Sequence, residues 1–209
     1  MPQTAAPLPP PPPGYQPAER FQYPKLALQV VAIVVLLITT PLLLILIGFL
    51  QGWSGGIAFV AGLRDFGLVV LTVLIIVVVH ELIHGLAYQL FGYRVTYGAS
   101  LQLMAAYAGA FGQWQRRDHN IVVALAPLLV LTTLLPLLAS ASPTLVLVGF
   151  TALLFNTGGA VGDLYLAWRL LRLPRATLLY DVDPQTMLIF LPAENKEQRT
   201  ENKGSAADR

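Results

Sequence analysis

Four long runs of apolar residues limit what this chain can fold into. They cover residues 26–50, 66–92, about 121–140 and 144–168. Each run reaches the ~20 residues that a helix needs to cross a lipid bilayer. The runs are continuous rather than alternating, which favours helices over a barrel as the structure that satisfies the backbone in lipid. We therefore predict an α-helical membrane protein with about four transmembrane helices, surrounded mainly by the lipid bilayer.

The composition agrees with this prediction and excludes several kinds of chemistry. Of the 209 residues, 56% are hydrophobic and only 11% are charged, which is outside the usual balance of soluble proteins. The basic residues are scattered between apolar runs instead of forming a patch, so we predict no nucleic-acid partner. The chain contains no cysteine, which excludes disulfides, thiolate metal sites and cysteine nucleophiles. A bound metal would need histidine, aspartate or glutamate as ligands.

Two shorter segments predict β-hairpins beside the helices. Residues 93–112 are too short and too rich in glycine for another spanning helix, and their β-branched and aromatic residues indicate a hairpin after the second helix. Residues 177–192 have two apolar runs around a Val-Asp-Pro-Gln turn, which indicates another hairpin after the fourth helix. Within the apolar runs, Pro41, Pro127 and Pro136 predict local kinks rather than breaks.

The two ends of the chain differ from the apolar middle. Residues 1–20 are rich in proline and predict a disordered tail, with docking to a proline-binding partner as the less favoured alternative. Residues 21–65 would form the first transmembrane helix and its loop, and residues 66–192 a membrane domain. Residues 193–209 predict a second disordered tail.

Basic residues also predict the orientation in the membrane. With four spans, both termini lie on the same side as the loop after the second helix, and every lysine and arginine except Arg64 falls on that side. Because basic residues accumulate in cytoplasmic loops, we expect both termini to be cytoplasmic. The protein would be a multi-pass integral membrane protein, located in the plasma membrane if its source is a prokaryote.

The second apolar run contains the sequence His80-Glu81-Leu82-Ile83-His84. Residues four apart project from the same face of a helix, so His80 and His84 can share one metal ion. A hydrolytic zinc site needs three protein ligands and a fourth position for water, and Glu81 is placed to take a proton from that water. The alternative is that these polar groups only bond to neighbouring helices, but ionisable groups within a span are costly and usually have a function.

The motif lacks a third ligand, for which Asp163 is the leading candidate because no other carboxylate outside the motif lies within a predicted span. On a single helix, Asn156, Gly159, Ala160 and Asp163 would share one face. A role of Asp163 in pairing with Arg169 is the alternative reading. Other candidates for the third ligand are His119, Asp181 and Asp183, which lie in predicted loops.

Asn156 is an amide in the same apolar run, where we expect it to be buried. It could donate a hydrogen bond to a developing oxyanion, or simply bond to a neighbouring helix.

On these residues the chain resembles the putative zincin peptidases, a domain family distantly similar to the site-2 proteases. The resemblance runs from about residue 66 to 192 and rests on HELIHGL at 80–86, the hairpin-like segment after Tyr93, LAP at 125–127, and an asparagine and an aspartate separated by six residues at 156–163. It implies His80, His84 and Asp163 as ligands of one zinc ion and Glu81 as the base.

The site-2 pattern Asn-x-x-Pro-x-Pro-x-Leu-Asp-Gly is only partly present. Between Asn156 and Asp163 the chain has neither proline and is one residue shorter, and Leu164 follows the aspartate. The carry-over of Asn156 is therefore the weakest. The predicted function is hydrolysis of peptide bonds in or near the cytoplasmic half of the bilayer, with a peptide or membrane protein as substrate. A non-catalytic metal-binding scaffold or transporter, and a family member with structural duties only, are the alternatives.

Overall fold

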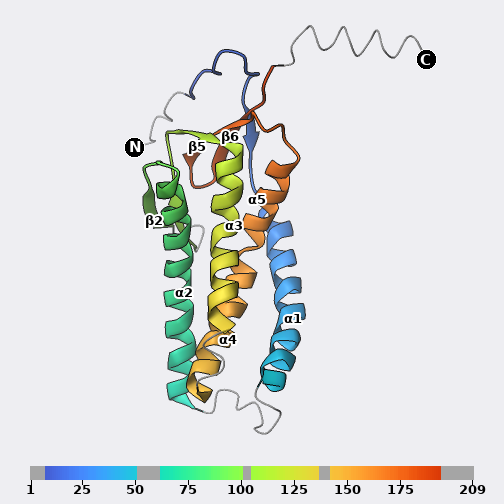
Figure 1. The fold of residues 1–209 in the computed structure, drawn as a ribbon, viewed down its shortest axis with the longest axis vertical. Coiled ribbons are helices and arrows are strands. Elements are labelled where there is room, and N and C mark those ends of the chain that lie inside the picture. The colour runs from blue at the N-terminus through green and yellow to red at the C-terminus, as the bar shows by residue number, and fades with distance from the viewer. Residues whose placement is uncertain (1–7, 51–61, 101–104, 137–141, 194–209) are drawn as a thin grey trace, which may run out of the picture.

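The computed structural model describes residues 8–50, 62–100, 105–136 and 142–193. Its helices are α1 (Lys25–Leu50), α2 (Leu63–Leu90), α3 (Arg117–Leu134), α4 (Pro143–Gly159) and α5 (Val161–Leu171). Its strands are β1 (Glu19–Phe21), β2 (Thr96–Ser100), β3 (Ala105–Gly109), β4 (Trp114–Arg116), β5 (Leu178–Asp183) and β6 (Thr186–Phe190). The helices form an elongated bundle, and the strands lie at the end of it where α2 finishes and α3 begins (Figure 1).

Among the described residues, α1, α2 and α3 are long and apolar enough to cross a membrane, and α4 with α5 would make a fourth span if the bent pair is counted as one. The 28 residues of α2 extend over about 42 Å, more than the ~30 Å of a hydrocarbon core. Large apolar side chains on these helices, including Leu37, Leu74 and Leu129, are exposed in the isolated chain. Such a surface is typical of helices that face lipid, since water-soluble proteins rarely expose so much apolar area.

The fourth apolar run is not one straight helix. A bend of 41° separates α4 from α5 at Ala160, where the backbone N–H still donates to the Asn156 carbonyl at 3.0 Å. The expectation of a single helix across Asn156 and Asp163 is therefore wrong, but both side chains still face the same neighbour, because both contact His80. The bend places Asp163 in the first turn of a new helix, whereas Asn156 belongs to the last turn of α4.

The prolines affect the helices differently from one another. α1 continues through Pro41 and α3 through Pro127. α3 ends at Leu134, so Pro136 lies beyond the helix instead of inside it. This outcome is physically simple, because a proline two residues past a helix end disturbs none of its hydrogen bonds.

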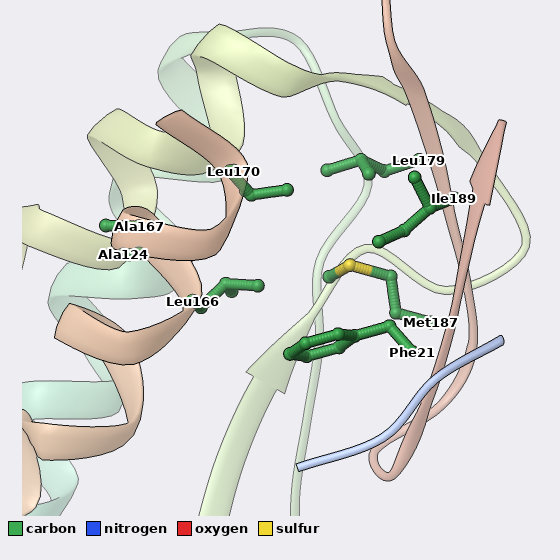
Figure 2. Close-up of a cluster of buried hydrophobic side chains, with 8 residues drawn as sticks. All are labelled: Phe21, Ala124, Leu166, Ala167, Leu170, Leu179, Met187 and Ile189. Atoms are coloured by element: carbon green, nitrogen blue, oxygen red, sulfur yellow. The ribbon is translucent and has the colours of Figure 1, made fainter. Parts of the chain in front are cut away.

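Both predicted hairpins are present as antiparallel strand pairs, β2 with β3 and β5 with β6. The second hairpin is part of a larger sheet with the order β1-β6-β5-β4, which the sequence did not predict. One face of this sheet packs on α3 and α5 (Figure 2). The buried side chains at this contact come from both layers, and they are Phe21, Ala124, Leu166, Ala167, Leu170, Leu179, Met187 and Ile189.

The N-terminal segment is part of this layer, so the prediction of a disordered tail is wrong for residues 15–20. Strand β1 pairs with β6, and the Gln16 N–H donates to the Leu191 carbonyl at 2.9 Å. The Tyr15 hydroxyl donates to the Ala176 carbonyl at 2.8 Å. An extended segment keeps its N–H groups wherever proline is absent, so it can complete a sheet edge. Residues 1–7 and 194–209, for which tails were also predicted, lie outside the described residues.

Candidate metal centre

Two histidines project from one face of α2 near the end of the bundle that carries the sheets. His80 and His84 are ten and six residues before the last residue of the helix, or about 15 and 9 Å along its axis. Both are buried, and their ring centroids are 4.8 Å apart. The four-residue spacing therefore brings the two imidazoles together, as predicted from the sequence.

A carboxylate from α5 meets both rings. The Nε2 atom of His80 lies 3.1 Å from Oδ2 of Asp163, and Nε2 of His84 lies 3.4 Å from the same oxygen. Asp163 is thus the carboxylate that contacts the two histidines. Among the described residues, no ion pair between Asp163 and Arg169 is recorded. Asp163 makes these contacts from the first turn of α5, just after the bend at Ala160.

The other nitrogen of each ring is held by an oxygen. His84 Nδ1 lies 2.9 Å from the Val123 carbonyl, and His80 Nδ1 lies 3.0 Å from Oδ1 of Asn156. A carbonyl oxygen can only accept, so Nδ1 of His84 must carry a proton. The same holds for His80 when the Asn156 amide presents its oxygen. In that orientation the buried Nδ2 of Asn156 has no partner within the part of the chain that the structure describes. Each neutral ring then has its lone pair on Nε2.

This arrangement of donor atoms fits a metal ion. Two nitrogen lone pairs and a carboxylate oxygen point at one another, which is repulsive unless a cation or an additional proton lies among them. Zinc holds nitrogen and oxygen ligands at 2.0–2.2 Å in a tetrahedron, which puts neighbouring ligand atoms about 3.3 Å apart. The distances of 3.1 and 3.4 Å match that spacing. Imidazole and carboxylate ligands, with outer hydrogen bonds fixing the rings, are a zinc-type ligand set.

Glu81 is the second carboxylate near these rings. Ligand atoms of His80, Glu81 and His84 all lie within 4.8 Å of one another, and the Ala108 backbone on β3 makes a hydrogen bond to the Glu81 carboxylate. Asp163 fits the third ligand position better, because a single oxygen is in reach of both Nε2 atoms. Glu81 is half-buried and borders the same cavity, so its carboxylate can face a water molecule in that space.

These side chains open into a cavity of about 270 Å³. One wall is made by α2 and α5, and another by residues 106–109 of β3. The turn of the β5–β6 hairpin closes a further side, including Asp183 and Met187. The cavity is therefore large enough for water and for part of a peptide, and it lies between the helices and the strands.

A chain of buried hydrogen bonds leads from α2 to the β5 strand. The Tyr88 hydroxyl donates to Asn120, whose amide donates to Gln115, and the Gln115 amide donates to Asp181 at 2.9 Å. Burial raises the pKa of Asp181 to about 6, the Gln115 hydrogen bond opposes that rise, and nearby Asp183 adds to it. Tyr88, Asn120 and Asp181 all border the cavity.

The series of hydrogen bonds from Tyr88 to Asp181 was not predicted from the sequence, and neither was the contact of the Val123 carbonyl with His84. One signal was available for Tyr88, which is four residues after His84 and continues the same helix face.

The other candidates from the sequence lie apart from the two histidines. His119 stacks on Phe91 with ring centroids 4.1 Å apart, and its Nδ1 lies 2.9 Å from the Tyr93 hydroxyl. Asp181 is held by Gln115, and the exposed Asp183 accepts a hydrogen bond from the Gln185 N–H. None of the three is recorded in contact with His80 or His84 among the described residues.

The fold and the site define a class: a bundle of long apolar helices with a His-Glu-x-x-His metal-site motif facing a cavity. The chain belongs to the family described as "putative zincin peptidase", whose model matches residues 73–178, about half of the chain. That match includes the whole motif and Asp163. The family description implies metallopeptidase chemistry with zinc. No curated protein and no solved structure matches the chain. The similarity to site-2 proteases stays a prediction.

Proposed function

We propose that this protein is a membrane-embedded zinc metallopeptidase that hydrolyses peptide bonds in or near the cytoplasmic half of the bilayer. One observation carries the proposal: Nε2 of His80 and Nε2 of His84 converge on one oxygen of Asp163, beside Glu81 and an open cavity. In this proposal the three converging side chains hold one zinc ion. Bound zinc supplies a Lewis acid that lowers the pKa of water and polarises a carbonyl group.

The residues of the chain have separate roles in this proposal. Glu81 accepts the proton of the attacking water and later delivers it to the leaving amine. Asn156 and the Val123 carbonyl fix the two imidazoles so that each Nε2 faces inward. The oxyanion role considered for Asn156 from the sequence would use its Nδ2 group, for which no partner is recorded among the described residues, and it stays a prediction. The contact that the structure records is between Oδ1 of Asn156 and His80. Asn156 is thus a positioning residue here.

The lipid bilayer and the orientation belong to the same proposal. Three or four apolar helices support insertion, and the basic residues support cytoplasmic termini. Because the chain lacks cysteine, Ser142→Cys and Ala176→Cys each create a single exposed thiol, one at the start of α4 and one before β5. A membrane-impermeant maleimide should label only the first from outside. Labelling of Ala176→Cys from outside would contradict the proposed orientation and indicate the opposite one.

A peptide or membrane-protein segment is the proposed substrate, bound in extended form. The carbonyl groups of a helix are shielded by their own hydrogen bonds, so a helical substrate must unwind around the peptide bond that is cleaved. Strand β3 borders the cavity, and among the described residues it pairs with no strand other than β2, which favours addition of a substrate strand at its second edge. This edge would place the extended backbone beside Glu81.

The proposal is tested by comparing wild type with Glu81→Gln, both purified in detergent without chelator. Glu81→Gln should keep its zinc and fold but lose cleavage of a pooled peptide library by at least about a hundredfold. Glu19→Gln, at an exposed position in β1, is the matched control and should cleave like wild type. Equal cleavage by Glu81→Gln would refute the peptidase and favour a metal-binding scaffold or transporter. Absence of zinc from all three proteins would favour a purely structural family member.

A further inference from the structure

We propose that Asp181 is a specificity-determining residue, which binds a cationic group of the peptide substrate inside the cavity that contains His80, His84 and Asp163. The cation is an ammonium or guanidinium group, from a lysine or arginine side chain or from a free N-terminus. This inference rests on the proposed peptidase function and adds a substrate class to it.

The position of Asp181 in its strand is unusual for a carboxylate. Along β5 the side chains alternate, and Asp181 lies on the same buried face as Leu179. Its exposed fraction is only 7%. An apolar residue is expected at such a position, because burying an unpaired carboxylate is costly. Yet Asp181 borders the cavity instead of packing inside the apolar cluster.

The fold does not require a negative charge at this position. Gln115 donates from Nε2 to Oδ2 of Asp181 and to the Ala110 carbonyl, and its Oε1 accepts from Asn120. The amide of Gln115 therefore needs only a neutral acceptor, which an asparagine at 181 would supply equally well. No donor to the Oδ1 atom of Asp181 is recorded among the described residues. A carboxylate that is nine-tenths buried, with one oxygen unpaired at a cavity wall, is suited to a cationic ligand.

The charge of the whole cavity points the same way. Its described lining includes the four carboxylates of Glu81, Asp163, Asp181 and Asp183, and no lysine or arginine. One divalent ion would balance two of these four charges. The remainder favours a positively charged ligand, and the low dielectric of a partly enclosed site strengthens that preference. Tyr23, Tyr107 and Met187 add apolar surface against which the stem of a lysine or arginine can lie.

The experiment compares zinc-loaded wild type, Asp181→Asn and Glu19→Gln in lipid nanodiscs. Each is incubated with pooled synthetic peptides that carry lysine, arginine or uncharged norleucine at each position, with acetylated or free N-termini. Wild type should cleave peptides with the cation at one fixed position about tenfold to a hundredfold faster, measured as kcat/KM, than the norleucine peptides. Asp181→Asn should lose most of that difference. Glu19→Gln, at an exposed position in β1 that is not among the described residues lining the cavity, should keep it. Comparison of acetylated with free peptides shows whether the recognised cation is a side chain or the N-terminal ammonium group.

A second readout separates this inference from the peptidase proposal. The affinities of the same peptides are measured by fluorescence anisotropy for Glu81→Gln and for Glu81→Gln combined with Asp181→Asn. If no protein cleaves but the cationic peptides bind more tightly through Asp181, the inference stands and the peptidase proposal fails. Cleavage without any preference for cations, or a preference that survives Asp181→Asn, overturns the inference and leaves the peptidase proposal intact. Equal zinc content and thermal unfolding of the variants verify their fold.

Discussion

Asn156 reaches His80 from another helix, and this single contact fixes which nitrogen of the imidazole faces Asp163. Removing it by Asn156→Ala should lower zinc affinity about tenfold to a hundredfold, as expected for loss of an outer hydrogen bond to a ligand. Asn156→Asp keeps an acceptor and should bind zinc at least as tightly as Asn156→Ala. Competition with a chromophoric chelator measures the affinities. The neighbouring Thr157→Ala, whose hydroxyl bonds only within α4 to the Leu153 carbonyl, is the control. Unchanged affinity in Asn156→Ala would contradict the positioning role.

Asp181 has an energetic cost that its hydrogen bond to Gln115 does not remove. Its pKa rises from 3.8 to about 6 in the folded protein, chiefly through burial. The folded state therefore holds the proton more tightly than the unfolded state, and this residue reduces stability as pH rises from about 4 to about 6. A residue that lowers stability at neutral pH suggests a functional reason for its presence.

At the residue scale, the sequence predicted the side chains whose spacing follows from one helix. His80, Glu81 and His84 are such a set, and Asp163 could be found because few carboxylates occur in apolar runs. Val123 contributes through its backbone, which no residue pattern reveals. Gln115 and Asn120 become partners of Asp181 only through the sheet, so their connection depends on tertiary structure.

Helix α2 and the β2–β3 hairpin are in close contact at Gly85. A Cβ atom on Gly85 would overlap the ring of Tyr97 in β2. Gly85→Ala should therefore push the Tyr97 ring away from α2 and loosen the contact of the hairpin with this helix. The cost should be about 1 kcal/mol, at the low end for overpacking, because Tyr97 is 45% exposed and its ring can turn outward. Hydrogen exchange across β2 and β3, and the cleavage rate, report the displacement.

The rescue and the control for this element are both available in the chain. Gly85→Ala combined with Tyr97→Ala removes the overlap, so hydrogen exchange should return toward that of Tyr97→Ala alone. Gly67→Ala lies on the same helix with open space around the added methyl group. It should leave the hairpin unchanged. Similar exchange in Gly85→Ala and Gly67→Ala would show that the hairpin does not depend on this contact.

At the element scale, length decided what the sequence could predict. The long apolar runs predicted the helices, and the turn at residues 182–185 predicted the second hairpin. Strands β1 and β4 have three residues each, which is too short for an alternating pattern to be recognised. The bend at Ala160 lies inside a continuous apolar run, so hydropathy does not reveal it. Packing of α5 under the sheet accompanies the bend and is a tertiary effect (Figure 2).

The whole molecule gathers its polar chemistry at one end of an apolar bundle. The metal-site residues belong to α2 and α5, and the strands lie at the end of the bundle where α2 finishes (Figure 1). The first half of α2 carries mostly exposed apolar side chains. If the termini are cytoplasmic, as proposed, this arrangement would put the cavity near the cytoplasmic face. Water and an extended peptide would reach it there without crossing the hydrocarbon core.

The proposed function requires a metal ion shared by α2 and α5, and the metal content of the protein tests this directly. Elemental analysis of wild type purified without chelator should give about one zinc per chain, the number of ions expected for a single site. Asp163→Ala should lose most of that zinc, and Asp183→Asn should keep it. Zinc-free wild type that cannot be loaded, or Asp163→Ala that retains a full equivalent, would contradict the account.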